Sequence, residues 1–189
     1  MEFITNLDSQ ILLYIQEHIR NDTLNPYVIT FTHLGDGGIL WIITSIILMC
    51  FKKTRKIGLV CAFSLLIGAL ITNVTLKNIV ARTRPFYAIE DLVTLINYPK
   101  DFSFPSGHST SWFAGGCGMF LTINKRVSFI FLILATLMGF SRLYVGVHYP
   151  TDVLCGLIVG VVSAIVSYHL VKRLYSKCDK SLTSDTSLN

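Results

Sequence analysis

Long runs of apolar residues alternate with short polar segments along most of the chain. The five longest runs occupy residues 27–51, 57–76, 108–123, 127–147 and 153–171. A helix needs about 20 residues to cross roughly 30 Å of hydrocarbon. The run at 108–123 is short, and we include it because the polar segments on either side of it must lie on opposite sides of the membrane. The pattern predicts an all-α membrane protein, a bundle of about five transmembrane helices.

The first 20 residues show a different spacing, in which apolar side chains recur every three or four positions. The apolar members are Phe3, Ile4, Leu7, Ile11, Tyr14, Ile15, His18 and Ile19, and the polar members opposite them are Asp8, Ser9, Gln16 and Glu17. This spacing predicts an N-terminal amphipathic helix over residues 1–20, which lies on the membrane or docks against the bundle. Glu2 and Asp8 stand where a signal peptide has its basic region, so we do not interpret the segment as one.

No internal repeat or linker divides the chain. We therefore expect a single membrane-embedded domain over residues 1–175. The last residues, 176–189, are polar and favour a flexible cytoplasmic tail.

Composition agrees with a membrane protein and excludes several other classes. Of 189 residues, 52% are apolar and only 14% are charged, against a usual charged share of about 25%. The mean hydropathy is +0.58. So few charges cannot cover the surface of a small soluble domain, and the balance also excludes a disordered chain or a coiled coil. Four of the five cysteines lie in apolar runs without a CxxC pair, which indicates small buried hydrophobes rather than disulfides or metal ligands.

The positive charges follow the predicted topology. The net charge is +5, and ten of the 16 basic residues occupy three segments that alternate along the chain. These are Lys52, Lys53, Arg55 and Lys56, then Lys125 and Arg126, then Lys172, Arg173, Lys177 and Lys180. Because cytoplasmic loops are enriched in Lys and Arg, we expect these three ends and the C-terminus in the cytoplasm. Topology thus accounts for the positive charge, and we do not expect nucleic-acid binding.

Two cations stand at the extracytoplasmic end of the second run. Lys77 and Arg84 are seven positions apart and are followed by Pro85. Residues at this spacing share a helical face, and proline stops a helix, so we expect both cations to point at one spot. The alternative is that both anchor the helix at the membrane interface.

The sequence Pro105-Ser106-Gly107-His108 opens the third run. Ser106 is a favoured N-cap residue, and Gly107 allows close approach of the backbone to a ligand. The free N–H groups of such a helix start form an anion site. The alternative is an ordinary capped helix with an incidental histidine.

A third group surrounds the start of the fifth run. Asp152 lies one helical turn after His148, and Arg142 precedes both. A histidine whose one ring nitrogen is held by a carboxylate presents the other as a base or nucleophile. The alternative is that Asp152 only caps the helix.

Taken together, the three segments resemble the three-part motif of the type 2 phosphatidic acid phosphatase superfamily, the lipid phosphate phosphatases. The resemblance covers residues 77–152, and the membrane layout is similar to that of small bacterial undecaprenyl-diphosphatases and phosphatidylglycerophosphatases. It implies that His148 is the nucleophile and forms a phosphohistidine, that His108 is the general acid and base, and that Asp152 orients His148. It implies a phosphate site made by Lys77, Arg84, Ser106, Gly107 and Arg142.

The resemblance implies an integral membrane lipid phosphatase without cofactor or metal, acting on a phosphate monoester or diphosphate end group. We expect undecaprenyl diphosphate as the substrate. Phosphatidylglycerophosphate, phosphatidate and diacylglycerol diphosphate remain alternatives, and a lipid or anion transporter is a remote one. The expected partners are the lipid substrate and the bilayer, with the site on the extracytoplasmic side. Protein partners and the oligomeric state are left open.

Several other polar residues have no assigned role. His33 and Asp36 lie near the outer end of the first run, and Arg82 lies inside the first motif. The acidic residues Glu90, Asp91, Asp101 and Asp152 lack the clustered spacing of a two-metal site. The apolar residues of the loop 86–104 suggest a lid over the site.

Overall fold

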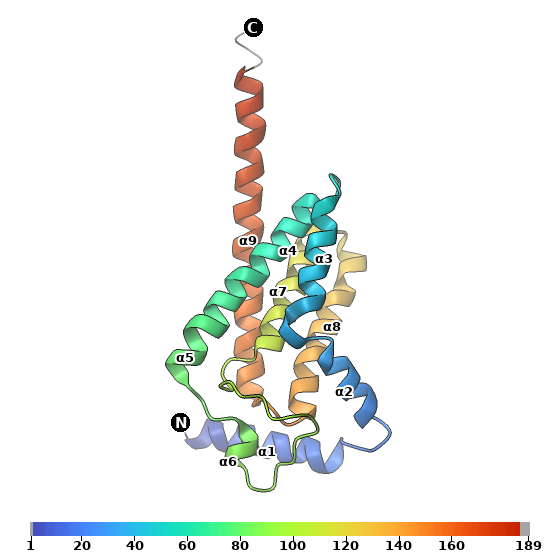
Figure 1. The fold of residues 1–189 in the computed structure, drawn as a ribbon, viewed down its shortest axis with the longest axis vertical. Helices are drawn as coiled ribbons and strands as arrows, with labels where there is room; N and C mark the ends of the chain where they lie inside the picture. Colours follow the sequence, from blue (N-terminus) through green and yellow to red (C-terminus); the bar gives the residue numbers. More distant parts are fainter. Residues whose placement is uncertain (1, 186–189) are drawn as a thin grey trace.

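The computed structural model describes residues 2–185, and every regular element in that range is a helix. In chain order these are α1 (Glu2–His18), α2 (Asn25–His33), the 3₁₀ turn η1 (Asp36–Gly38), α3 (Ile39–Cys50), α4 (Arg55–Ala69), the π-helix η2 (Leu70–Leu76), α5 (Lys77–Val80), α6 (Pro85–Ala88), α7 (Gly107–Thr122), α8 (Lys125–Tyr144) and α9 (Pro150–Asp185). The long helices form one bundle (Figure 1). The predicted all-α class is confirmed for this part of the chain.

Three helical stretches are long and apolar enough to cross a membrane: Arg55–Ala88, Lys125–Tyr144 and Pro150–Ser176. A fourth results if α2 and the η1–α3 helix, bent by 41° at the break between them, form one span. The remaining predicted span corresponds to α7, which has 16 residues. The multi-pass membrane architecture is therefore confirmed, whereas the count of five spans stays a prediction.

Helix α7 is the buried centre of the bundle. Most of its residues are buried, and it contacts α3, α4, α8 and α9. A Cβ atom at Gly115 would lie 2.3 Å from the Trp41 ring, and one at Gly116 would lie 2.9 Å from the Phe131 carbonyl oxygen. Glycine at these positions thus allows α3 and α8 to pack closely on α7. Because this packing fixes α7 in the core, it also fixes the position of the Pro105–His108 motif at the start of the helix.

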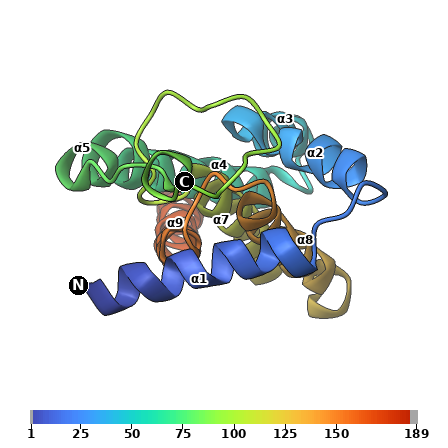
Figure 2. The same ribbon diagram turned by 90° about the horizontal axis from the view of Figure 1, so that it is seen from below.

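Helix α1 lies across one end of the bundle, crosswise to the long helices (Figures 1 and 2). Leu12 and Ile15 are buried there, whereas Phe3 is 80% exposed and Leu7 is 48% exposed. Asp8, which the sequence placed on the polar face of the helix, is only 2% exposed. The predicted separation of an apolar from a polar face is therefore wrong in part, because α1 docks on the bundle through Asp8 as well as Leu12 and Ile15. Asp8 is buried there because it has charged and polar partners, and some of the apolar residues of α1 face outward.

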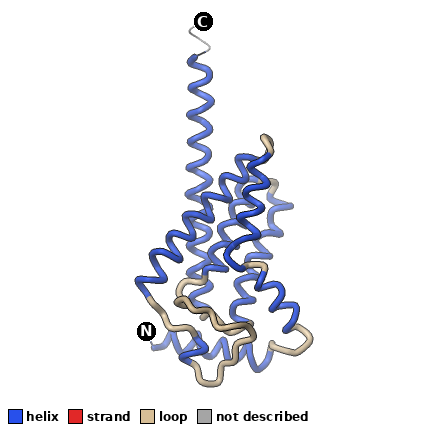
Figure 3. Tube along the Cα trace, viewed as in Figure 1, coloured by secondary structure: helices blue, strands red, loops and turns tan. Residues whose placement is uncertain are grey.

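The two ends of the bundle differ in the way that the charge pattern predicted. The α3–α4 turn, the α7–α8 turn and the far end of α9 lie at one end, and these carry the basic groups (Figure 1). Helices α1 and α6 and the long loop before α7 lie at the other end (Figure 3). Helix α9 continues to Asp185, past residue 176 where the sequence placed the start of a flexible tail. Residues 186–189 of that tail lie outside the described residues.

Candidate functional site

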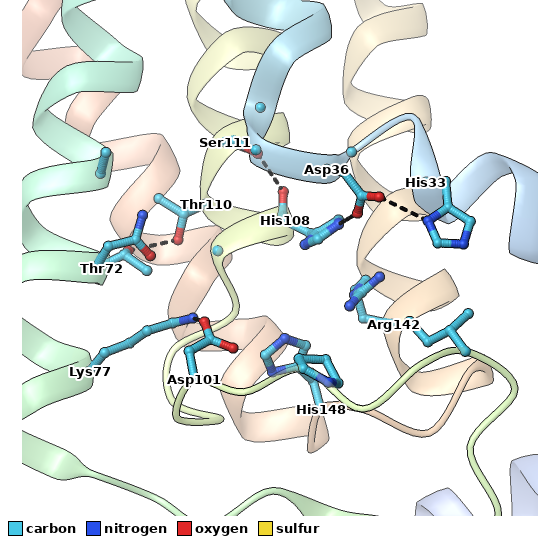
Figure 4. Close-up of a pocket in the computed structure, with 18 of the residues that line it drawn as sticks. His33, Asp36, Thr72, Lys77, Asp101, His108, Thr110, Ser111, Arg142 and His148 are labelled. Atoms are coloured by element: carbon cyan, nitrogen blue, oxygen red, sulfur yellow. Dashed lines mark hydrogen bonds and ion pairs between the residues drawn. The ribbon is translucent and has the colours of Figure 1, made fainter.

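A cavity of about 600 Å³ opens at the end of the bundle where the long loop lies. Six of the predicted site residues line it: Lys77, Arg84, Gly107, His108, Arg142 and His148. Figure 4 shows the side chains of four of these pointing into one space from separate helices and loops. The structure thus brings together the three motifs that are far apart in the sequence.

The backbone around Lys77 and Arg84 differs from the prediction of one helix ended by Pro85. Helix α5 ends at Val80, because Ala81 is left-handed with φ of 46°. Arg84 is extended, as the residue before a proline prefers, and Pro85 begins α6. The shared-face argument is therefore wrong. The two cations still meet, because the break at Ala81 turns the chain back toward the cavity.

Asp101 occupies the space between these two cations. Lys77 Nζ forms an ion pair with Asp101 Oδ2, and Arg84 Nη2 lies 2.5 Å from Asp101 Oδ1. Arg84 Nε also donates to the Asp101 carbonyl oxygen at 2.8 Å. Burial alone raises the pKa of the Asp101 carboxyl, but Lys77 and Arg84 outweigh it and lower this pKa to about 2. In this structure an ionised carboxylate therefore pairs with the two cations that the sequence analysis predicted to bind phosphate.

His148 is buried at the wall of the cavity, with 2% of its side chain exposed. Its Nδ1 lies 3.5 Å from Asp152 Oδ2, so the two side chains meet as predicted, although His148 lies just before α9 (Pro150–Asp185) and not on the same helix as Asp152. Its Nε2 lies 3.4 Å from Arg84 Nη1. Burial is the main cause that lowers the pKa of His148 to about 4; Asp152 opposes this shift, and Arg84 and Arg142 add to it. His148 is thus neutral at neutral pH, and with its proton on Nδ1 the Nε2 atom carries a lone pair, which faces Arg84 in this structure.

His108 faces the same cavity from the first turn of α7. Ser106 caps this helix as predicted, accepting a hydrogen bond from Ser109 N at 3.4 Å. His108 Nε2 lies 3.0 Å from Asp36 Oδ1, and the other oxygen of Asp36 lies 2.8 Å from His33 Nδ1 (Figure 4). His33 and Asp36, to which the sequence assigned no role, therefore hold a site histidine.

Arg142 is a buried cation with an unused hydrogen-bond donor. It is 3% exposed, and its Nη1 donates to Thr32 Oγ1 at 2.7 Å. Its Nε has no hydrogen-bond partner among the described residues. A buried guanidinium with an unmet donor indicates that an anion belongs beside it.

The long loop covers one side of the cavity, as the lid interpretation expects. Ile96, Asn97, Tyr98 and Pro99 line the cavity, and Tyr98 stacks on Phe86 with ring centroids 4.7 Å apart.

Within residues 2–185, no group of three or more His, Cys, Asp or Glu side chains is placed to hold a metal ion.

Sequence reasoning missed the carboxylates that contact this site. Asp101 was considered only as a metal ligand, although it stands four positions before Pro105 and so next to a motif. Asp36 was noted only as an ionisable residue near the end of an apolar run, and its contact with His108, 72 positions away, has no local signal. Ser106 and Asp152 do not line the cavity but lie behind it, at the N-cap of α7 and beside His148.

Comparison with known proteins identifies relatives of this chain in sequence and in structure. The sequence profile of the PAP2 superfamily matches residues 58–176. An undecaprenyl-diphosphatase from Sulfolobus acidocaldarius is 36% identical over 138 residues, covering 73% of this chain and 66% of that protein. The PAP2-type phosphatidylglycerolphosphate phosphatase from Bacillus subtilis has a similar structure, with a TM-score of 0.73, 29% identity, and coverage of 94% of this chain and 88% of that one. LpxE from Aquifex aeolicus is also similar in structure, with a TM-score of 0.74 and 26% identity. The match covers 84% of this chain and 92% of that one.

Proposed function

The chain belongs to the PAP2 superfamily and is a membrane phosphatase, and we propose that its substrate is undecaprenyl diphosphate, which it hydrolyses to undecaprenyl phosphate and inorganic phosphate. The observation that carries the chemistry is the convergence of His108, His148 and three cations on one cavity. The choice of lipid is supported by the archaeal undecaprenyl-diphosphatase at 36% identity.

The charge of the site fits a terminal phosphate. Such a group carries about two negative charges near neutral pH. Lys77, Arg84 and Arg142 supply positive charge, and the N-terminus of α7 at Ser106 and Gly107 supplies backbone N–H groups. Phosphoryl transfer depends mainly on positioning and on stabilising charge at the phosphoryl oxygens. These residues therefore hold the phosphoryl group in line with His148.

Two displacement steps complete the reaction. In the first, His148 Nε2 bonds to the terminal phosphorus, the bond from phosphorus to the bridging oxygen breaks, and His108 gives its proton to the departing lipid phosphate. In the second, His108 takes a proton from water, the water oxygen bonds to phosphorus, and the P–N bond breaks to release phosphate. Asp152 faces Nδ1 of His148 throughout and stabilises the positive charge that the ring gains on phosphorylation.

The substrate phosphate takes the place of Asp101 in this scheme. Lys77 and Arg84 cannot bind the Asp101 carboxylate and a phosphate through the same donors. Asp101 lies in the loop between α6 and α7, which also covers the cavity, so binding shifts this loop. Without substrate, the Asp101 carboxylate neutralises the two cations; the substrate phosphate, which carries more negative charge, displaces it.

The distribution of basic residues supports a cavity on the extracytoplasmic side and a C-terminus in the cytoplasm. A cysteine introduced at Asn97, in an otherwise cysteine-free protein, tests this orientation. We expect a membrane-impermeant maleimide to label it in intact cells. Labelling only after the cells are opened would reverse the orientation.

A substrate panel tests the choice of lipid. The purified protein in proteoliposomes is given undecaprenyl diphosphate, phosphatidylglycerophosphate, phosphatidate or diacylglycerol diphosphate, and released phosphate is measured. We expect the highest kcat/KM for undecaprenyl diphosphate and no release by His148→Ala. A higher kcat/KM for another lipid would transfer the proposal to that lipid, and lipid movement without phosphate release would favour a transporter.

The same assay in excess chelator tests independence from metal ions. We expect full activity, because three cationic side chains provide the charge compensation. Loss of activity that added Mg²⁺ restores would contradict the proposed mechanism.

A further inference from the structure

Asp8 is an acidic residue of α1 that is buried against the bundle, with 3% of its side chain exposed. Burial of a carboxylate is costly unless charged or hydrogen-bonding partners compensate it. Its Oδ2 lies 2.8 Å from Arg82 Nη2 and accepts a hydrogen bond from Thr151 Oγ1 at 2.5 Å. Its Oδ1 accepts from Thr151 N at 3.1 Å. Asp8 thus ties α1 to the start of α9 and to the segment after α5.

Arg82 joins Asp8 to the carboxylate behind His148. Arg82 Nη1 lies 2.7 Å from Asp152 Oδ1 and 2.7 Å from Thr151 Oγ1. The guanidinium also lies over the Tyr149 ring, 3.8 Å from its centroid. Arg82 therefore bridges two buried carboxylates, one from α1 and one from α9, in a fixed plane.

The second oxygen of Asp152 has separate partners. Asp152 Oδ2 accepts from Ser103 Oγ at 2.5 Å and from Tyr149 N at 2.9 Å, and it is the oxygen that faces His148. Ser103 N in turn donates to the Arg82 carbonyl oxygen at 2.9 Å. Arg82, Ser103 and Asp152 thus form a closed ring of contacts, and Asp8 holds it from outside.

We propose that Asp8 and Arg82 are positioning residues for the phosphatase reaction, which hold Asp152 so that His148 presents Nε2 to the substrate. The proposal rests on the nucleophilic role of His148. A carboxylate held at both oxygens cannot rotate away from the imidazole. A displacement of about 1 Å at a reacting group costs about 100-fold in rate. The N-terminal helix, which contains none of the family's motifs, is then part of the catalytic unit.

The position of these residues relative to the cavity separates this role from substrate binding. The residues that line the cavity include Lys77, Arg84 and Arg142 but neither Asp8 nor Arg82. Loss of Asp8 or Arg82 should therefore lower kcat and leave KM unchanged. Loss of a lining cation should change both.

The first experiment measures kcat and KM for Asp8→Asn, Arg82→Met and Arg82→Lys in the full-length protein. Phosphate release is normalised to monodisperse, folded protein. We expect kcat to fall about 10- to 100-fold for Asp8→Asn and Arg82→Met, because a misplacement of up to about 1 Å at His148 is worth up to about 100-fold in rate. Arg82→Lys should recover part of the loss, because a lysine keeps the charge but lacks the planar fork that bridges two carboxylates. The matched control is Glu17→Gln, which removes an exposed acidic group from the same helix and should leave kcat unchanged.

A double-mutant cycle tests whether Asp8 acts through Asp152. In the Asp152→Asn background, we expect Asp8→Asn to lower kcat by less than twofold, because the group that it positions is already altered. An undiminished effect in that background, or a raised KM with unchanged kcat, would overturn the proposal. If Asp8→Asn is not recovered as folded protein, the same cycle is run with Arg82→Lys.

The substrate used is whichever lipid the wild-type protein hydrolyses fastest in the panel. A different preferred lipid thus overturns the choice of undecaprenyl diphosphate and leaves the test of Asp8 and Arg82 intact. The phosphohistidine is checked separately, by trapping an acid-labile phosphoenzyme in the wild type and its absence in His148→Ala.

Discussion

The site contains two pairs of a histidine and a carboxylate, and the two pairs have opposite surroundings. In the His148–Asp152 pair, 2% and 0% of the side chains are exposed. In the His108–Asp36 pair, 18% and 55% are exposed. Asp152 accepts hydrogen bonds from Arg82, Ser103 and the Tyr149 backbone, whereas each oxygen of Asp36 has one histidine partner, His108 or the exposed His33.

The difference matches the different tasks that we assign to the two histidines. A nucleophile that bonds to phosphorus needs a fixed position, and a buried, fully bonded carboxylate provides it. A general acid and base must exchange protons with the leaving group and with water, so its surroundings must be open to both. The following predictions test this contrast.

The largest effect is expected from His148→Ala. Without Nε2 no covalent intermediate forms, and we expect kcat to fall by at least about 10⁴-fold. Phosphate release from the preferred lipid measures this loss. Residual activity within a factor of ten of the wild type would rule out His148 as the nucleophile.

The two carboxylates should differ strongly in their contributions. We expect Asp152→Asn to lower kcat by about 10⁴-fold, as in the equivalent change in a Ser-His-Asp triad. Asp36→Asn should cost only about tenfold, because an exposed pair is weakened by solvent. Parallel measurements of kcat for both variants test this contrast, and equal losses would contradict it.

Arg142→Gln should remove a charge that stabilises the transition state. We expect a loss of about 3 kcal/mol, or at least about 100-fold in kcat/KM. Arg142→Lys should not restore full activity, because the guanidinium also donates to Thr32. The control is Arg126→Gln, an exposed cation at the other end of the bundle, which should leave kcat/KM unchanged.

The pH dependence should report the burial of His148. Its pKa is lowered to about 4, so His148 is neutral above that pH and becomes protonated as the pH falls through it. After correction for ionisation of the substrate, kcat/KM should decrease only below about pH 4 on account of this group. If kcat/KM instead decreased below about pH 6.5 because of His148, this histidine would be less buried than the structure indicates.

Features set by neighbouring residues could be predicted from the sequence. The apolar runs determine an all-helical membrane protein, because backbone groups in lipid must be satisfied within each helix. The His148–Asp152 contact joins residues four positions apart at the start of α9, and the Ser106 cap follows from the residue type at a helix start. In each case a few consecutive residues suffice, since both contacts form within the short segment that begins a helix.

Only the tertiary structure decided which distant groups meet. The contacts of Asp101 with Lys77, of Asp36 with His108 and of Asp8 with Arg82 join residues 24, 72 and 74 positions apart. The last of these contacts lies on the face of α1 that packs against the bundle, and the break at Ala81 returns the chain toward the cavity. Periodicity describes one helix at a time, whereas these pairs depend on how separate helices and loops pack, which no local pattern contains.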